Sequence, residues 1–202
     1  MEEDSAIARP VIGIAGGVGS GKSTVARILG ELGCVVADSD AMGRAALLDA
    51  TIRDTLVDWW GPDILGEDGA IDRARVARIV FTDAGQRRRL ESLVHPWIEQ
   101  RRLALFDAAP PDAKALVIDA PLLFEAGLDR VCDAVVFVDT DRDSRADRLR
   151  TSRGWDLEEL TRREDSQLPL DEKRARSDHV VINNGDLHEL SDQVRRILNK
   201  LT

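Results

Sequence analysis

Short apolar runs alternate with amphipathic stretches along this chain. The runs at 11–15, 34–37, 115–119, 134–138 and 180–182 are each mainly apolar and rich in β-branched residues. Continuous apolar runs of this length are typical of strands that are covered on both faces of a parallel sheet. Strands that alternate with helices imply an α/β fold, so the pattern predicts a five-stranded parallel sheet flanked by helices. In such sheets, ligands bind at the carboxyl ends of the strands.

The stretches between these runs carry apolar residues at helical spacing. We expect helices at about 22–32, 41–48, 51–60, 72–81, 83–107, 144–152, 157–166, 170–176 and 187–201. Gly33 suits the position just after the first helix, and Asp72 can cap the fourth. Pro96 lies within the longest stretch and is expected to kink it.

The chain of 202 residues is long enough for one well-buried α/β core, so we expect a single domain. Its core is expected at 10–49, 111–141 and 177–202. The helical segments 50–110 and 142–176 are too long to be plain crossovers between strands. We interpret the first as a ligand-binding insert and the second as a lid.

Composition excludes several classes of protein. Hydrophobic residues make up 43% and charged residues 32%, as in ordinary soluble domains. The net charge of −9 argues against non-specific binding to nucleic acid. No apolar run approaches the ~20 residues of a membrane span, and Met1–Pro10 lacks the regions of a signal peptide. Cys34 and Cys132 lie in or beside apolar runs, which favours buried thiols and a reducing cytoplasm.

The most specific motif follows the first predicted strand. Residues 16–24 contain G-x-x-x-x-G-K-[ST], with Gly16, Gly21, Lys22 and Ser23 at the fixed positions, and a helical stretch comes next. A strand, this loop and a helix in that order bind phosphate, because loop N–H groups and the helix dipole converge on phosphate oxygens. The alternative is a glycine-rich turn before an ordinary helix. We expect a nucleoside triphosphate to bind to Gly17, Val18, Gly19, Ser20, Gly21, Lys22, Ser23 and Thr24.

Two residues of this loop have defined roles in phosphate chemistry. Lys22 would reach the β- and γ-phosphates, and the Ser23 hydroxyl would ligate Mg²⁺. Lysine occurs elsewhere only at 114, 173 and 200, in a chain that otherwise uses arginine. A compact ammonium group suits the role of a point charge at the loop.

A phosphate loop alone does not separate kinases from ATPases and GTPases. The fourth strand leads only to Asp139-Thr140-Asp141, without the N-K-x-D sequence that reads guanine in GTPases. Asp40, after the second strand, could accept a proton from an acceptor hydroxyl during phosphoryl transfer. From position alone, Asp40 could equally cap a helix that starts at Ala41. Asp119, at the end of the third strand, could lie near the water shell of the metal or serve as a cap or turn residue.

Arginines are concentrated in the segment 142–176. Arg153 and Arg163, with Arg148 and Arg162 nearby, are candidates for neutralising the transferring phosphoryl group when a lid closes. The alternative is a solvated helix face on which the arginines pair with acidic neighbours (Glu158, Glu159 and Glu164). The histidines form no metal-ligand cluster in the sequence.

Several motifs together resemble those of the dephospho-CoA kinase family over nearly the whole chain. The phosphate loop is close to T-G-G-I-G-S-G-K-S, although Ala15 replaces the first Thr. Asp38 and Asp40 with Arg44 resemble D-A-D-x-x-x-R, and His95-Pro96 resembles an H-P pair. The remaining motifs are P-L-L-F-E at 121–125, the lid residues Arg153, Arg163 and Gln167, and A-D-x-V-I-x-N-x-G, which ends with Asn183 and Gly185.

The resemblance implies a P-loop, nucleotide-kinase-like fold with strand order 2-3-1-4-5 and phosphorylation of the 3′-hydroxyl of dephospho-CoA. It implies ATP and Mg²⁺ as cofactors, and Asp40, Lys22 and Arg153 as catalytic residues. Asn183 and Gly185 would lie near the adenine. The acceptor would be bound by the insert 50–110 and by residues Asp40, Arg44, His95, Leu122, Phe124, Glu125, Arg163 and Gln167.

Two other functions stay open from the residues alone. The chain could be a different small-molecule P-loop kinase, or a nucleotide-binding regulator that hydrolyses ATP slowly. For the kinase, we expect a small-molecule substrate, no nucleic acid or membrane partner, a cytoplasmic location, and a monomer or small homo-oligomer.

Overall fold

A computed structural model describes residues 9–202. Within this range the chain forms two compact units. The sheet unit contains the described residues up to Asp38 together with Ala109–Thr202, and the helical unit is Ser39–Ala108. The expectation about a signal peptide concerns Met1–Pro10, of which the first eight residues lie outside the described range.

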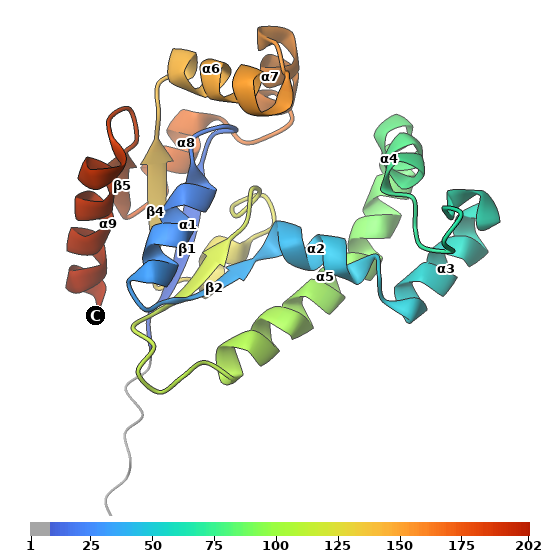
Figure 1. The fold of residues 1–202 in the computed structure, drawn as a ribbon, viewed down its shortest axis with the longest axis horizontal. Coiled ribbons are helices and arrows are strands. Elements are labelled where there is room, and N and C mark those ends of the chain that lie inside the picture. Colours follow the sequence, from blue (N-terminus) through green and yellow to red (C-terminus); the bar gives the residue numbers. More distant parts are fainter. Residues whose placement is uncertain (1–8) are drawn as a thin grey trace, which may run out of the picture. The chain divides into compact units, whose positions relative to one another are not determined.

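The sheet unit is built around one parallel sheet. Within residues 9–202, the sheet contains β1 (Val11–Gly16), β2 (Val35–Asp38), β3 (Leu116–Asp119), β4 (Ala134–Asp139) and β5 (His179–Ile182). The order is β2-β3-β1-β4-β5, and every neighbouring pair is parallel (Figure 1). The predicted fold class and strand order are confirmed. Because the strands are parallel, their carboxyl ends share the edge at which the loop after β1 begins.

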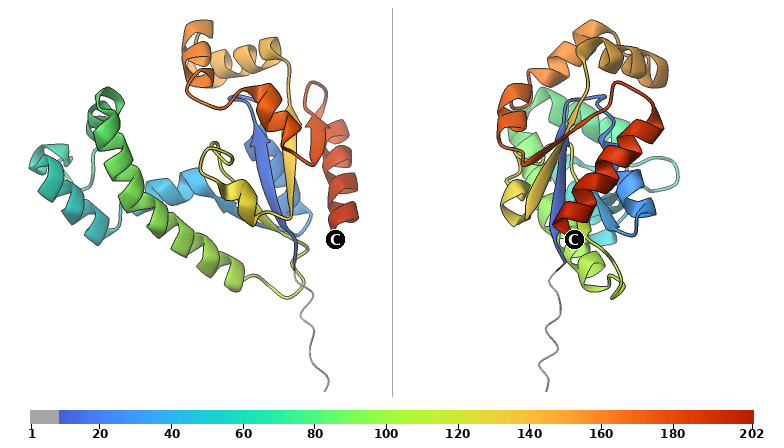
Figure 2. Two further views of the ribbon diagram at one scale, coloured as in Figure 1. Left: turned by 180° about the vertical axis from the view of Figure 1, so that it is seen from behind. Right: turned by 90° about the vertical axis from the view of Figure 1, so that its left-hand side faces the viewer.

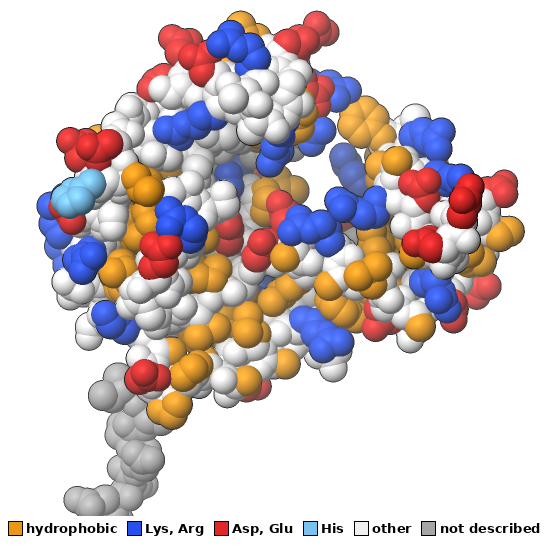
Figure 3. Space-filling model, in the orientation of Figure 1, with side chains coloured by type: hydrophobic (Ala, Val, Ile, Leu, Met, Phe, Trp, Pro, Cys, Tyr) orange, Lys and Arg blue, Asp and Glu red, His pale blue; other side chains and the backbone are white. Residues whose placement is uncertain are grey.

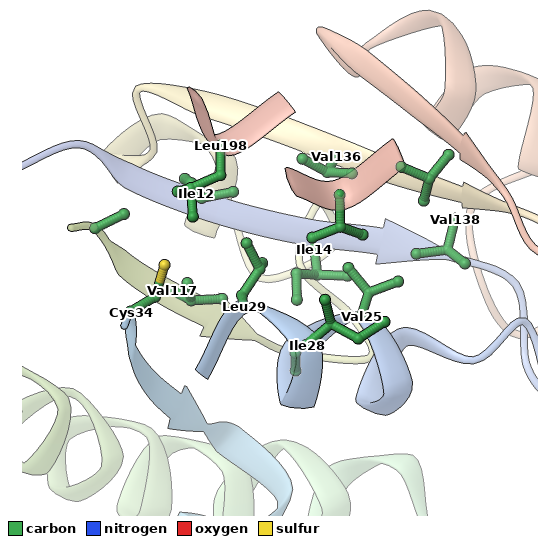
Figure 4. Packing of buried hydrophobic residues seen from close by; sticks show 14 of the residues in the cluster. Ile12, Ile14, Val25, Ile28, Leu29, Cys34, Val117, Val136, Val138 and Leu198 are labelled. Atoms are coloured by element: carbon green, nitrogen blue, oxygen red, sulfur yellow. The ribbon is translucent and has the colours of Figure 1, made fainter. Parts of the chain in front are cut away.

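Two helices cover one face of this sheet. α1 (Lys22–Glu31) and α9 (Leu187–Leu201) pack on each other and on the strands. Figure 4 shows apolar side chains of β1, such as Ile12 and Ile14, between those of the two helices, such as Leu29 and Leu198. This apolar core explains why the strands appear in the sequence as continuous hydrophobic runs.

The other face is covered by shorter elements. α8 (Leu170–Ala175) packs on β1. The segment after β3 includes a 3₁₀ turn, η2 (Leu128–Val131), and brings Leu123 and Cys132 against Gly13. A Cβ at Gly13 would lie 2.8 Å from side-chain atoms of both residues, so glycine allows this close approach. α6 (Arg142–Arg153) and α7 (Leu157–Glu164) follow the carboxyl end of β4 (Figure 2).

The helical unit has its own apolar core. It consists of α2 (Ser39–Ala46), α3 (Ala50–Trp60), the 3₁₀ turn η1 (Pro62–Ile64), α4 (Arg73–Thr82) and α5 (Ala84–Asp107). Side-chain oxygens of Asp49, Asp72 and Asp83 accept backbone N–H bonds and cap α3, α4 and α5. The buried core residues are Ala46, Ile52, Leu56, Ile64, Ile71 and Val76. The predicted cap at Asp72 is confirmed.

One local expectation differs from the structure. α2 starts at Ser39, so Asp40 lies inside its first turn and is not the residue that caps a helix from Ala41. In α5, Pro96 lies inside the helix, which continues to Asp107. Pro96 has no N–H to donate to the Ser92 carbonyl, and both residues are exposed, so water can satisfy that oxygen.

The described part of the chain holds no helix that combines the length and apolar character needed to cross a bilayer. Cys34 is a buried thiol, and Cys132 is a partly buried thiol that donates to the Leu128 carbonyl at 3.2 Å. Burial raises the pKa of the Cys34 thiol, against smaller opposite effects of a backbone hydrogen bond from Ala115 and the charge of Lys114.

Candidate active site

The loop between β1 and α1 depends on its glycines. Gly16, Gly19 and Gly21 have φ values of 148°, 77° and 92°, which L side chains rarely adopt. A Cβ on Gly21 would also lie only 2.3 Å from Nδ2 of Asn183. Glycine is therefore required here by the backbone conformation, and at Gly21 also by the close approach of Asn183. A loop of this kind directs successive backbone N–H groups toward phosphate oxygens.

The Ser20 carbonyl ties this loop to the ends of two other strands. It accepts hydrogen bonds from Asn183 Nδ2 at 2.7 Å, Thr140 Oγ1 at 2.9 Å and Arg148 Nη1 at 3.4 Å. Asn183 follows β5 and Thr140 follows β4, and both are buried. Arg148 also donates to the Asn183 carbonyl at 2.7 Å. The predicted nucleotide residue Asn183 is thus part of the support of the loop, while Gly185 lies exposed in the turn beyond it.

Lys22 and Ser23 open helix α1. Lys22 Nζ donates to the Gly16 and Gly17 carbonyls at 3.0 and 2.9 Å, so its ammonium group lies over the loop. Ser23 is exposed in the first turn. The glycine cradle, the ammonium group and the helix N-terminus fit the phosphates of a nucleotide.

Oxygen donors for a hard cation occur at the same edge of the sheet. Asp38 and Asp119 are register partners at the ends of β2 and β3, and Asp119 also pairs with Ile14 of β1. Carboxylate and hydroxyl oxygens are the donors that Mg²⁺ prefers, and Mg²⁺ usually keeps several waters. Ser23 with these carboxylates therefore fits a partly hydrated Mg²⁺.

A cavity of about 610 Å³ lies between the phosphate loop and the segment after β4. Its lining consists of Gly17, Val18, Arg142, Arg145, Thr161, Glu164, Asp165, Gln167, Leu168, Pro169 and Leu170. Arg145 is only 4% exposed and donates to the Thr140 carbonyl at 3.1 Å and the Val18 carbonyl at 3.4 Å. It also forms an ion pair with Glu164 of α7. Arg145 therefore links α7 to the phosphate loop.

Arg153 and Arg163 both place their guanidinium groups over the indole ring of Trp155. The guanidinium carbons are 4.8 Å and 4.3 Å from the ring centroid of Trp155. Arg163 also donates to Glu159 at 2.7 Å, and Figure 3 shows acidic and basic side chains interleaved over α6 and α7, at the top of the view. Both alternatives for these arginines therefore have a structural basis: they are held near each other, and one also has an acidic partner.

The segment 121–125 presents its residues in different ways. Leu122 is 42% exposed, while Phe124 is buried beneath the guanidinium group of Arg176, 4.5 Å from the ring centroid. Glu125 turns its carboxylate toward Lys173 Nζ, at 2.8 Å. The Phe124 ring therefore supports this segment by packing beneath its surface.

Lys173 also joins Glu125 to Gln167. Its Nζ donates to Gln167 Oε1 at 2.9 Å, and Glu125 Oε1 accepts the Leu168 N–H at 2.9 Å. Burial alone raises the pKa of the Glu125 carboxyl, but the hydrogen bonds from Lys173 and Leu168 and the charge of Lys173 outweigh this effect. The net pKa lies below its ordinary value.

The remaining predicted residues belong to the helical unit. Asp40 and Arg44 are exposed in α2, four residues apart and so on one side of the helix. His95 is exposed in α5, on which α2 packs. The tryptophans of this unit take structural positions: the Trp97 indole donates to Asp49 at 3.1 Å, and Trp60 to Gln86 at 2.8 Å.

Sequence reasoning missed three residues of the sheet-unit site. Thr140, Arg145 and Lys173 are buried polar residues that bond to the phosphate loop or to predicted site residues. The sequence features that could have indicated them were weak. Thr140 comes just after the carboxyl end of a predicted strand, and Lys173 is one of four lysines in the chain. In the described residues, no group of three or more His, Cys, Asp or Glu is arranged to hold a metal ion.

Known proteins are similar to this chain in sequence and in fold. A family model described as dephospho-CoA kinase matches residues 10–189. A dephospho-CoA kinase of Syntrophotalea carbinolica is 39% identical over 95% of this chain and 92% of its own length. One of Geobacillus kaustophilus is 40% identical, with 94% and 95% covered. The crystal structure of TT1252 from Thermus thermophilus is 34% identical, with a TM-score of 0.82 and 96% and 98% covered.

Proposed function

The chain belongs to the dephospho-CoA kinase family, and we propose that it carries out the family's reaction with the residues described above. The reaction is ATP-dependent phosphorylation of the 3′-hydroxyl of dephospho-CoA, which gives coenzyme A and ADP and completes coenzyme A synthesis. The observation that carries the residue assignment is the phosphate loop, whose positive-φ glycines and Lys22 lie beside a cavity that Arg142 and Arg145 help to line.

The donor site is assigned to the sheet unit. Loop N–H groups from Gly17 to Thr24 and the Lys22 ammonium group bind the phosphates of ATP. Asn183 holds the loop through the Ser20 carbonyl. With Gly185, it is assigned to the part of the site that would bind the adenine. Arg153 stabilises the charge on the transferring phosphoryl group, because a guanidinium group donates to several phosphate oxygens at once.

A magnesium ion is assigned to Ser23. Mg²⁺ would neutralise the charge that develops during transfer. The hydroxyl of Ser23 would supply one ligand. Asp119, next to β1 in register, is suited to bind the water shell.

Roles toward the acceptor are assigned residue by residue, separately within each unit. Asp40 accepts the proton of the 3′-hydroxyl as that oxygen attacks phosphorus. Arg44 and His95 bind anionic or polar groups of the acceptor, and Arg163 acts with Arg153. The remaining acceptor-side residues are Leu122, Phe124, Glu125 and Gln167.

We also propose a cytoplasmic protein that acts on a small molecule as a monomer or small homo-oligomer. Two cysteines present as thiols suit a reducing compartment.

ADP release with and without a panel of acceptors tests the proposal. Stimulation by dephospho-CoA alone, with 3′-phosphate in the product, is the expected result. Stimulation by a nucleoside or sugar instead would identify a different small-molecule kinase. Slow release that no acceptor stimulates would favour a nucleotide-hydrolysing regulator.

A further inference from the structure

The buried lysine of α8 has no place in the reaction assigned above. Lys173 is 1% exposed, and its side chain is among the most deeply buried of the described residues. A buried ammonium group requires a nearby negative charge and hydrogen-bond acceptors. Glu125 supplies the charge at 2.8 Å, and Gln167 supplies a second oxygen at 2.9 Å. Lys173 therefore joins two residues that are 42 positions apart in the sequence (167 − 125).

This pair also holds backbone. Glu125 Oε1, which binds Lys173, accepts the N–H of Leu168 as well. Gln167 and Leu168 belong to the short connection between α7 and α8. One residue of the connection is thus held through its side chain and the next through its backbone.

The connection forms a wall of the cavity beside the phosphate loop. Residues 167–170 line that cavity together with Gly17 and Val18. A Cβ on Gly17 would lie 3.3 Å from Leu170 Cδ1, so the wall and the loop are in close contact. A displacement of the connection would change the space at the loop.

The support behind the wall is itself fixed. Arg176, just after α8, pairs with Asp129 at 2.8 Å, and its guanidinium group lies over the Phe124 ring. Ser177 Oγ donates to the Lys173 carbonyl at 2.8 Å. These contacts fix α8 and the segment after β3 relative to each other. Through the hydrogen bonds of Lys173 and Glu125, the connection between α7 and α8 is fixed to both.

We propose that Lys173 is a positioning residue for phosphoryl transfer, which with Glu125 holds residues 167–170 as the cavity wall beside the phosphate loop. Glu125, whose carboxylate is taken by Lys173 and the Leu168 N–H, then affects the acceptor through the wall and not by contact with the acceptor. The inference rests on the proposed function for the identity of the reaction.

Steady-state kinetics of Lys173→Met give the first test. We expect kcat to fall at least tenfold while the Kd for ATP stays within threefold, because the loop N–H groups are unchanged. Lys114→Met, at an exposed lysine of the sheet unit, is the matched control and should keep wild-type kcat within twofold. Wild-type kcat in Lys173→Met would overturn the proposal.

The double variant Lys173→Met/Glu125→Gln separates positioning from folding and from direct contact. It leaves neither charge buried alone, so its Tm should exceed that of Lys173→Met, and it replaces the single variant if that one does not fold. If Glu125 acts only through Lys173, the double variant keeps the reduced kcat of the single variant within twofold. A kcat of the double variant well below that of Lys173→Met would show that Glu125 has a separate contact with the acceptor. Wild-type kcat in the double variant would show that the pair matters only for stability. Either result contradicts the proposal.

Hydrogen exchange tests the wall without any turnover. The Leu168 amide should exchange at least tenfold faster in the double variant than in wild type or Lys114→Met. Unchanged exchange would overturn the positioning role. This measurement remains informative if the wild-type protein does not phosphorylate dephospho-CoA, so failure of the proposed function is distinguished from failure of this inference.

Discussion

Gly21 is subject to two independent constraints at the residue scale. Its φ of 92° disfavours any side chain, and a Cβ there would collide with the amide of Asn183. Asn183 in turn holds the Ser20 carbonyl at 2.7 Å. A side chain at Gly21 must therefore move the loop, the amide or both, and displaces the support of the phosphate site.

Gly21→Ala should lower kcat/KM for ATP about 10²-fold, as misplacements near 1 Å commonly do. Gly30→Ala is the matched control, because Gly30 lies within α1 and its Cβ would meet only Val36 at 3.7 Å. The control should gain about 0.5–1 kcal/mol in unfolding free energy from helix propensity and keep its activity. Steady-state kinetics give kcat/KM for ATP of both variants, and urea unfolding gives their unfolding free energies. Equal kcat/KM for Gly21→Ala and Gly30→Ala would contradict the assigned role of the loop geometry.

Asp40→Asn should lower kcat by about 10²–10⁴-fold, the usual contribution of a general base. The Kd for ATP should be unchanged, because the donor residues lie elsewhere in the sequence. Loss of the carboxylate from the first turn of α2 should cost no more than about 1 kcal/mol of stability through the helix dipole. Asp58→Asn, at an exposed position of α3, is the control. Near-normal turnover in Asp40→Asn would remove Asp40 from the role of base.

At the scale of elements, α6 and α7 combine buried and exposed charge. Arg145 is buried against the phosphate loop and pairs with Glu164, so α7 is tied to the loop by a desolvated pair. Arg153 and Arg163 are exposed and are ordered by Trp155. Cation–π contacts of this kind contribute about 0.5–1 kcal/mol at exposed sites, enough to bias a rotamer without immobilising it.

Arg153→Ala should lower kcat about 10²-fold and leave the Kd for ATP within threefold, because the assigned contact strengthens only in the transition state. Arg150→Ala, which loses a surface pair with Asp147, should keep normal kcat. Kinetic and thermal-unfolding measurements on both variants distinguish the alternatives. An effect of Arg153→Ala on Tm alone would favour the solvated-face interpretation.

At the scale of the whole molecule, four carboxyls in the two units have lowered pKa values. In Asp49 the main cause is the hydrogen bond from Trp97, and in Asp141 it is the Ser144 N–H. In Glu159 it is the hydrogen bond from Arg163. In Glu125, burial opposes the shift, but the bonds from Lys173 and Leu168 dominate. Each group is thus favoured in its charged form by the folded state.

A lowered folded-state pKa contributes stability that is fully present above the unfolded pKa, about 3.9 for Asp and 4.3 for Glu. That stability is lost as the pH falls through the lower folded value. The unfolding free energy from urea titrations should therefore fall below about pH 4.5, and Asp49→Asn should make the fall shallower. An unfolding free energy that stays constant from pH 6 to pH 3 would contradict these shifts.

The amino-acid sequence alone determined the elements and the donor loop. Strands buried on both faces must be apolar throughout, so their runs were readable, and α1 was predicted from 22 where it begins. The glycines of the phosphate loop are likewise a local requirement of backbone conformation. The strand order came from family resemblance, because nothing local specifies which strands become neighbours.

Only the tertiary structure decided how the polar residues are paired. Thr140 and Asn183 meet at the Ser20 carbonyl across 120 and 163 positions, and Lys173 finds Glu125 across 48 (173 − 125). Charge and hydrogen-bonding capacity are visible in a sequence, but burial and distance decide their energetic value, and both arise only when remote segments are brought together. For that reason the sequence located the phosphate loop and assigned Glu125 and Gln167 to the acceptor, while the fold showed that Lys173 joins them.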